Sequence, residues 1–300
     1  MSEIQGWINL YKPKNISSFK AINKIKKKFL LKKIGHAGTL DPLAKGILPV
    51  AIGKATKLIS FVNNDIKKYY FTVSWGIQTS SDDSDGEILN RSNVFPELKE
   101  IEKIKNNFLG LVSQIPPKVS AIKINGQRAY KLFRKKQDFS ISPKEVFVKK
   151  IEVLTHKIDK TSFSLECGKG FYIRSFARDI ATQLGTLGHI SSLERVKVGN
   201  FTIETSILLD DLLKIGQRLD DFNCIKTSVS MLDDILAYEI EDKKDLNELS
   251  FGRPIKIEEE YIKKFSSKKI DKNFFLSNNG NIVSIGKLEG NLFKPNKILI

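Results

Sequence analysis

The stretch that most constrains this chain runs from Gly35 to Pro49 and reads GHAGTLDPLAKGILP. Its three glycines and two prolines argue against a regular helix or a central strand. Apolar residues, among them Leu40 and Leu43, alternate with these turn formers. The mixture predicts a loop that packs onto a scaffold and keeps one shape.

Asp41 stands in the middle of this stretch, directly before Pro42, which pushes its backbone toward the extended region. His36 lies five residues earlier. One interpretation is an active-site loop with Asp41 as its reactive group. The other is an ordinary surface loop in which Asp41 caps a turn, because Asp before Pro is a common turn signal. The loop alone leaves both open.

Charge is the main feature of the composition. Fifty Lys and Arg residues against 34 Asp and Glu residues give a net charge of +16 over 300 residues. Such an excess favours a polyanionic partner, most simply nucleic acid. An AT-rich genome would also inflate lysine, isoleucine and asparagine, so charge is only part of the argument. The length suits one large domain and one small one.

Several classes of protein are excluded by pattern. The only cysteines, Cys167 and Cys224, form no CxxC or Cys/His cluster, which argues against structural zinc and a disulfide scaffold. The polar loop 76–86 superficially suggests calcium, but Ser81 and Ser92 would occupy ligand positions 1 and 12. No signal peptide pattern and no apolar run of 18 residues occur, so a cytoplasmic protein without a membrane span is expected.

Periodicity predicts strands over 6–11, 67–75, 145–156 and 161–167 and helices over 54–62 and 96–110. A further helix begins at Ser17 or Ser18, and another follows the Gly168–Gly170 turn. The lysines of 24–33 form a solvated helix face or touch RNA phosphate. Residues 231–300 read as a small β-rich domain with strand-like runs at 274–277, 282–286 and 298–300.

Five motifs together resemble the TruB family of bacterial tRNA pseudouridine synthases. The loop resembles the family's G-H-x-G-T-L-D-P signature, and Lys12–Ser18 resembles its K-P-x-G-x-S-S motif, with Asn15 in place of glycine. Gln114–Tyr130, Cys167–Ser175 and Leu187–Arg195 resemble three more. The resemblance implies an α+β fold: a mixed, largely antiparallel pseudouridine-synthase sheet with flanking helices and a small β-rich C-terminal PUA-like domain. It implies a catalytic domain over 1–230, with an RNA-binding thumb around 115–145, and an RNA-binding domain over 231–300.

The same resemblance implies the activity: a tRNA pseudouridine(55) synthase that isomerises the T-loop uridine after flipping it out, with no cofactor and no metal. The implied partner is the T-stem-loop of tRNA, and a monomer is expected. By this resemblance Asp41, Tyr69 and Arg174 are catalytic, while Tyr172, Leu193, His36 and Lys12 bind substrate. Residue type alone also permits a core Tyr69, a loop-stabilising His36, a framework Lys12, and an Arg174 that pairs on the surface with Asp179 or Glu166.

The chemistry of these residues fits that activity. A site with one carboxylate lacks the paired acids of a standard glycosidase, and Gly46…Gly53-Lys54-Ala55 is no phosphate-binding P-loop. A single carboxylate can act as nucleophile or base, and a guanidinium beside it favours its charged form. Two other functions stay open at this point: a non-catalytic RNA chaperone or ribosome-assembly factor, and an enzyme of the same family that acts on another RNA.

Overall fold

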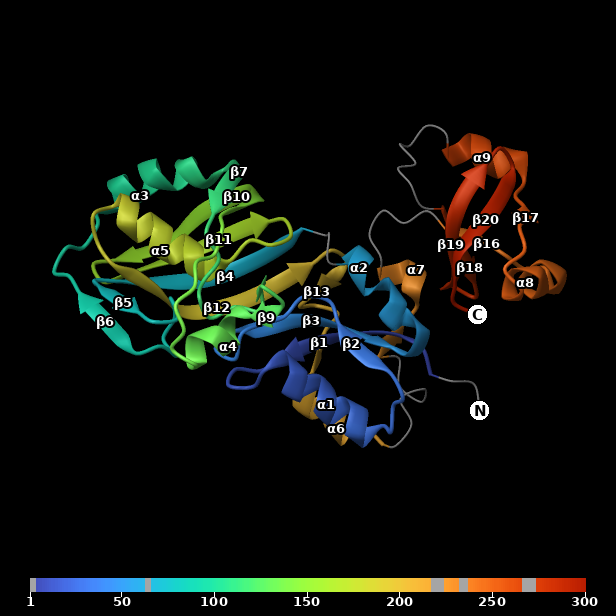
Figure 1. Ribbon diagram of the computed structural model, residues 1–300, viewed down its shortest axis with the longest axis horizontal. Helices are drawn as coiled ribbons and strands as arrows, with labels where there is room; N and C mark the ends of the chain where they lie inside the picture. The colour runs from blue at the N-terminus through green and yellow to red at the C-terminus, as the bar shows by residue number, and fades with distance from the viewer. Residues whose placement is uncertain (1–3, 63–65, 217–223, 232–236, 266–273) are drawn as a thin grey trace.

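The computed structural model describes residues 4–62, 66–216, 224–231, 237–265 and 274–300. A large mixed sheet forms the body, and a smaller sheet formed by the C-terminal residues lies at one side of it (Figure 1). This confirms the predicted α+β class with a largely antiparallel sheet and a β-rich C-terminal part. In the described part of the chain, no helix is both long and apolar enough to cross a membrane.

In sheet order the main path is β14 (Ile207–Leu208), β1 (Gly6–Lys12), β3 (Lys45–Ile52), β12 (Gly188–Val198), β4 (Lys67–Trp75), β11 (Lys160–Cys167), β10 (Lys144–Lys157) and β7 (Gly110–Gln114). The pairs β14–β1 and β3–β12 are parallel, and the others along this path are antiparallel. Three short strands pair beside it: β2 (Ile34–His36), β13 (Phe201–Thr202) and β15 (Ile225–Lys226).

Helices cover this sheet in two groups. α1 (Ser18–Lys28) and α6 (Leu209–Lys214) lie side by side next to β1, while α3 (Leu98–Ile104) and α5 (Ile173–Gln183) lie beside β4, β11 and β10 (Figure 1). Ser17 caps α1 by accepting the backbone N–H of Lys20, as predicted. The short helices are η1 (Gly53–Leu58), α2 (Ile59–Val62), η2 (Lys105–Phe108), α4 (Ala129–Arg134) and α7 (Ser228–Met231).

The C-terminal sheet has the order β16 (Ala237–Glu239), β18 (Phe274–Asn278), β19 (Asn281–Glu289), β20 (Leu292–Ile298) and β17 (Ile255–Lys256), with α8 (Lys243–Ser250) and α9 (Glu259–Phe265) beside it. Phe275 and Ile285 of this sheet pack in one apolar cluster with Trp7 and Phe201 of the body. The strand expected at 298–300 is wrong: β20 starts at Leu292 and ends at Ile298. Pro295 hid this strand, and β20 tolerates it because β17 pairs only with Leu292 and Phe293 on that side.

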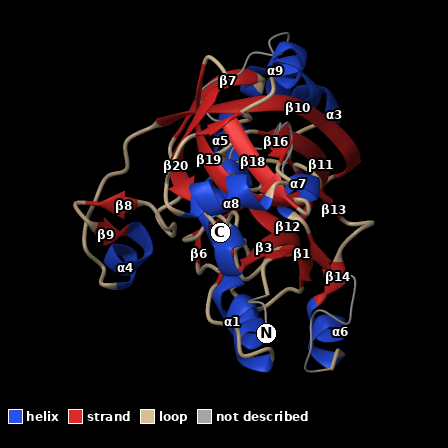
Figure 2. Ribbon diagram, turned by 90° about the vertical axis from the view of Figure 1, so that its right-hand side faces the viewer, coloured by secondary structure: helices blue, strands red, loops and turns tan. Residues whose placement is uncertain are grey.

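Two small hairpins complete the fold. β5 (Ile77–Thr79) and β6 (Ile88–Arg91) enclose the polar loop, and β8 (Lys123–Ile124) and β9 (Gln127–Arg128) meet at the Asn125-Gly126 turn. The second hairpin and α4 belong to residues 115–143, which we call the arm. The arm stands away from the body in Figure 2.

The structure contradicts the expectation that no central strand occurs between residues 35 and 49. Residues 45–49 begin β3, which lies between β1 and β12 and is buried on both faces. Pro49 is tolerated because β12 pairs only with Lys45 and Gly46 on that side, whereas β2 pairs only from Val50 onward. Pro49 therefore falls between two partner strands, where its missing N–H costs little. The true loop is confined to residues 37–44.

Two helices differ from the prediction, one in its winding and the other in its length. Residues 54–62 form a 3-10 turn followed by one short α-helix, and the helix expected over 96–110 covers only Leu98–Ile104 before η2. Its N-terminus is set by a capping box between Glu97 and Glu100. Gly110 already begins β7, with the positive φ of 79° that glycine allows.

Candidate active site

The loop that carries Asp41 is fastened on both sides of that residue. Ser18 Oγ, at the start of α1, accepts the N–H of Leu40 (2.8 Å) and donates to its carbonyl (2.9 Å). The N–H of Asn15 donates to the carbonyl of Pro42 at 2.8 Å, and Asn15 has a left-handed backbone (φ 63°), which asparagine tolerates better than most residues. With Leu40 and Leu43 buried beneath, the loop is held in one shape, as the sequence predicted.

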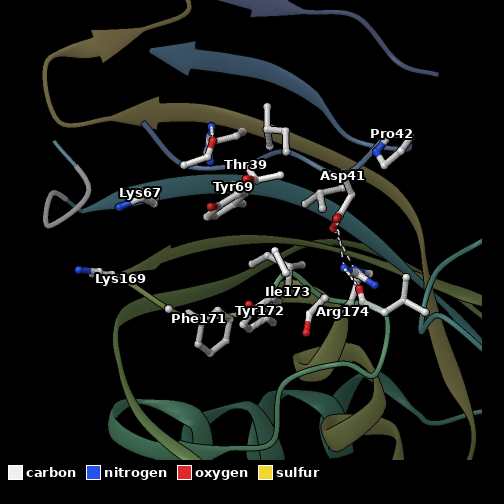
Figure 3. A pocket seen from close by; sticks show the side chains of 18 of the residues that line it. Thr39, Asp41, Pro42, Lys67, Tyr69, Lys169, Phe171, Tyr172, Ile173 and Arg174 are labelled. Carbon is white, nitrogen blue, oxygen red and sulfur yellow. Dashed lines mark hydrogen bonds and ion pairs between the residues drawn. The ribbon is translucent and has the colours of Figure 1, made fainter. Parts of the chain in front are cut away.

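Arg174 reaches this loop from the first turn of α5. Its Nε lies 2.9 Å from Asp41 Oδ2, and its Nη2 donates to Asp41 Oδ1 at 3.1 Å (Figure 3). The arginine side chain is 4% exposed and that of Asp41 is 35% exposed, so a buried cation meets a carboxylate that opens to the pocket. The surface alternative is wrong, because Glu166 pairs with Lys68 and Lys149 and Asp179 pairs with Arg178.

Arg174 also joins segments that the sequence did not connect. Its Nη1 donates to the carbonyl of Ser81 at 2.9 Å, and its Nη2 donates to that of Val119, in the arm, at 3.0 Å. Asp83 Oδ2 lies 3.6 Å from its Nε. One guanidinium thus ties the Asp41 loop, the polar loop and the arm together, using the fork of donors that only arginine offers.

Asp83 is one of the site residues that sequence reasoning missed. It is buried, it accepts hydrogen bonds from the Ser81 hydroxyl and the Asp85 N–H, and it faces Arg174. Burial raises the pKa of its carboxyl group, while the Ser81 hydroxyl and the Arg174 charge oppose that shift. The signal in the sequence is the group of acidic residues at 82–85, within the polar loop. Among the described residues, no cluster of His, Cys, Asp or Glu could hold a metal ion.

A pocket of about 530 Å³ lies beside this ion pair. Five of the seven predicted site residues line it: Asp41, Tyr69, Tyr172, Arg174 and Leu193. Figure 3 shows Asp41 and Tyr69 on one side of the pocket and Arg174 and Tyr172 on the opposite side. The arm contributes further lining from Val119, Ser120, Ala121, Tyr130 and Arg134.

The two tyrosines of the pocket have weakly acidic hydroxyl groups. Burial raises the pKa of Tyr69, which is 8% exposed, and the charge and hydrogen bond of Arg195 oppose that shift. Burial also raises the pKa of Tyr172, against the charge of Arg174. Both rings are therefore neutral at physiological pH and available for stacking and proton transfer.

His36 and Lys12 lie outside the pocket lining. Burial, followed by the charge of Arg195, lowers the pKa of His36, whose Nδ1 has no hydrogen-bond partner among the described residues. Lys12 is fully buried, and its Nζ donates to the carbonyls of Pro13 and Ile16 at 2.8 Å each. Burial lowers the pKa of Lys12 to about 8. This position favours the framework role for Lys12 over direct contact with RNA.

We expect Asp83→Asn to slow catalysis about 10- to 100-fold with little change in RNA binding, because Arg174 would lose one of two carboxylates that fix its orientation. The amide fills the same space, so the loss of stability should stay near 1–2 kcal/mol. Single-turnover rates and thermal unfolding measure the two effects. The exposed neighbour Asp85 provides the control, Asp85→Asn, and equal losses in the two variants would contradict the prediction.

Comparison with known proteins identifies the family. A model described as "TruB family pseudouridylate synthase (N terminal domain)" matches residues 26–173. A tRNA pseudouridine synthase B from Ehrlichia ruminantium (strain Gardel) is 38% identical over 296 residues, covering 98% of each chain. Another, from Ehrlichia chaffeensis (strain ATCC CRL-10679 / Arkansas), is 44% identical over 246 residues, covering 81% of this chain and 80% of the relative.

Solved structures show a similar fold at lower identity. A chain in the crystal structure of a Cbf5-Nop10-Gar1 complex aligns with a TM-score of 0.71 at 24% identity, covering 98% of this chain and 85% of that one. A chain in an H/ACA RNP bound to a substrate RNA containing 2'-deoxyuridine gives 0.71 at 22% identity, with the same coverage. The identity of the relatives over nearly full length carries the assignment: the chain belongs to the TruB family of pseudouridylate synthases.

Proposed function

We propose that this enzyme isomerises the uridine at position 55 of the tRNA T-loop to pseudouridine. The observation that carries the proposal is the Asp41–Arg174 ion pair on the wall of a pocket that also contains Tyr69. In this reaction the C1′–N1 bond breaks, the uracil turns, C5 bonds to C1′, the C5 proton leaves to solvent, and N1 takes up a proton. Atoms balance within one nucleotide and one proton exchange, so no cofactor, metal or energy source is required.

The proposal gives each pocket residue one role. Asp41 is the nucleophile, at C6 of the uracil or at C1′ of the ribose, and Arg174 keeps it ionised and aimed. Tyr69 stacks on the base and is the candidate to take up the C5 proton while its own hydroxyl proton passes to solvent. Tyr172 and Leu193 line the uracil site. His36 assists flipping from outside the lining, and Lys12 supports the 13–16 turn.

The target base must leave its stack to enter this pocket. Unstacking costs a few kcal/mol, which stacking on Tyr69 and contacts in the pocket offset. We place the catalytic domain at 1–230, with the arm as its RNA-binding thumb, and the PUA-like RNA-binding domain at 231–300. In support, β15 (Ile225–Lys226) still pairs with the body, whereas β16 (Ala237–Glu239) belongs to the C-terminal sheet. We propose a monomer that acts on tRNA in the cytoplasm.

A tritium-release assay tests the proposal. Purified enzyme is incubated with a tRNA transcript carrying tritium at uridine C5, alongside a transcript in which the T-loop uridine is replaced by cytidine. We expect about one equivalent of tritium release from the first and none from the second, since only a uridine that becomes pseudouridine loses its C5 hydrogen. Tight binding without release would favour a chaperone, and release that survives the replacement would favour another RNA site.

The lysines of α1 give a separate prediction about RNA affinity. Lys20, Lys24 and Lys27 are exposed at helical spacing, opposite the buried Ala21 and Ile25. The helix starts beside the Asp41 loop, and the hydrogen bond from the Leu40 N–H to Ser18 Oγ joins the two. Replacing the three lysines by glutamine keeps the helix and should weaken tRNA binding. The slope of log affinity against log salt concentration should fall by about two to three.

The single-turnover rate at saturating tRNA should not change in this triple variant. Lys99→Gln/Lys103→Gln on α3, at the opposite end of the body, provides the matched control (Figure 1). An unchanged salt slope in the triple variant would assign the α1 lysines to a solvated face without RNA contact.

A further inference from the structure

Arg195 of β12 lies where three strands of the body meet. It pairs with Gly46 of β3 on one side and with Tyr69 of β4 on the other. Lys12 pairs with Gly46 from β1, so one row of residues crosses four strands. A Cβ on Gly46 would overlap the backbone oxygen of Arg195, and the φ of Gly46 is 109°, so only glycine fits beside Arg195.

The guanidinium of Arg195 holds both ends of the Asp41 loop. Nη2 donates to the carbonyl of Gly38 at 2.9 Å, three residues before Asp41, and Nε donates to that of Ile47 at 2.8 Å, in β3. Arg195 also lines the pocket beside Tyr69, the residue opposite it in β4. The same side chain thus contacts the catalytic loop and lies beside the tyrosine that faces it.

Packing alone does not explain this arginine. Its side chain is 1% exposed, and it forms no ion pair with a carboxylate among the described residues. The fully buried Lys12 carries a second positive charge nearby, which makes the environment less favourable for Arg195. Burying a charge without a counter-charge is costly, and an apolar side chain of similar size often serves a core as well or better. This energetic cost points to a role for the guanidinium itself.

We propose that Arg195 is a positioning residue for the isomerisation: its guanidinium ties the two ends of the Asp41 loop to the strand pair that presents Tyr69. The carboxylate and the phenol come from separate segments, and Arg195 fixes one relative to the other. The proposal rests on the proposed function for its catalytic consequence. The mechanical part, a clamp on residues 37–47, stands on the hydrogen bonds alone.

Arg195→Gln tests the proposal, with Arg195→Lys as the conservative variant. We expect the single-turnover rate of Arg195→Gln to fall about 100-fold, the scale of a misplacement near 1 Å, while the tRNA dissociation constant stays within about threefold. Lysine retains the charge but lacks the several N–H donors of the guanidinium. The rate of Arg195→Lys should therefore be about tenfold higher than that of Arg195→Gln and still below that of the wild type. Arg91→Gln, at an exposed arginine of β6, is the matched control.

Amide hydrogen exchange separates a clamp from general support of the sheet. Exchange in residues 37–47 should accelerate in Arg195→Gln, while strands β10, β11 and β19 keep wild-type exchange. A wild-type rate in Arg195→Gln, or acceleration spread evenly over the sheet, would overturn the proposal. If the glutamine variant does not fold, the lysine variant decides by the same two readouts.

If wild-type enzyme releases no tritium, the proposed function fails, but the exchange of residues 37–47 still decides the clamp. Unchanged exchange there in both variants overturns it whatever the reaction is.

Discussion

Asp41→Asn is expected to abolish tritium release, with a loss of at least about 10⁴-fold, the scale on which removal of a nucleophile acts. The amide has the size of the carboxylate but cannot add to C6 or C1′ as an anion. Arg174 keeps its contacts with Asp83 and the Ser81 and Val119 carbonyls, so the pocket walls should stay in place. The tRNA dissociation constant should therefore change by less than about threefold.

Two measurements decide this prediction: single-turnover tritium release, and binding of unmodified tRNA by filter retention. Asp85→Asn, in the exposed part of the polar loop, is the matched amide control and should react like wild type. Product formation by Asp41→Asn within about 100-fold of the wild-type rate would remove Asp41 from the role of nucleophile. A parallel loss of binding would instead show that the variant disturbs the loop.

The sequence predicted four long strands of the body, β1, β4, β10 and β11, from the periodicity of their residues. In β4, Tyr69, Phe71, Val73 and Trp75 share the buried positions, as period-two alternation requires. Among the strands that were not predicted, β12 contributes Leu193 and Arg195 to the pocket. Its register shifts near Ser191 and again near Val196, so its alternation breaks twice within eleven residues. Bulges of this kind re-aim side chains next to active sites, and they hide the strand from pattern reading.

The site residues also include some that the sequence predicted and some that it did not. Motif resemblance placed Asp41, Tyr69, Tyr172, Arg174 and Leu193, and the structure brings all five to one pocket. The motif resemblance gave no role to Asp83 or Arg195, because the importance of these two residues comes from long-range contacts. Asp83 meets a residue 91 positions away, and Arg195 bonds Gly38 from 157 positions away. No local pattern of residue types contains such a contact, since it depends on how the sheet brings distant strands together.

Arg174→Met should cause the second largest effect, a loss of catalysis of about 10³-fold together with a loss of stability of about 3–5 kcal/mol. Methionine fills the space but leaves the buried Asp83 without a cation, and it releases the carbonyls of Ser81 and Val119. Breaking a buried ion pair from one side is costly because the remaining charge stays desolvated. Asp41 is partly exposed and adds less to this cost, but it loses its orientation.

The double variant Arg174→Met/Asp83→Asn separates these two effects. Removing the stranded carboxylate should restore about half of the lost stability, because a neutral amide can still accept from Ser81 without carrying a buried charge. Catalysis should stay as low as in Arg174→Met, since Asp41 still lacks its partner. Chemical denaturation and single-turnover release report the two quantities. A double variant no more stable than Arg174→Met would mean that Arg174 supports the fold through the carbonyls it joins, and that its pairing with Asp83 contributes little.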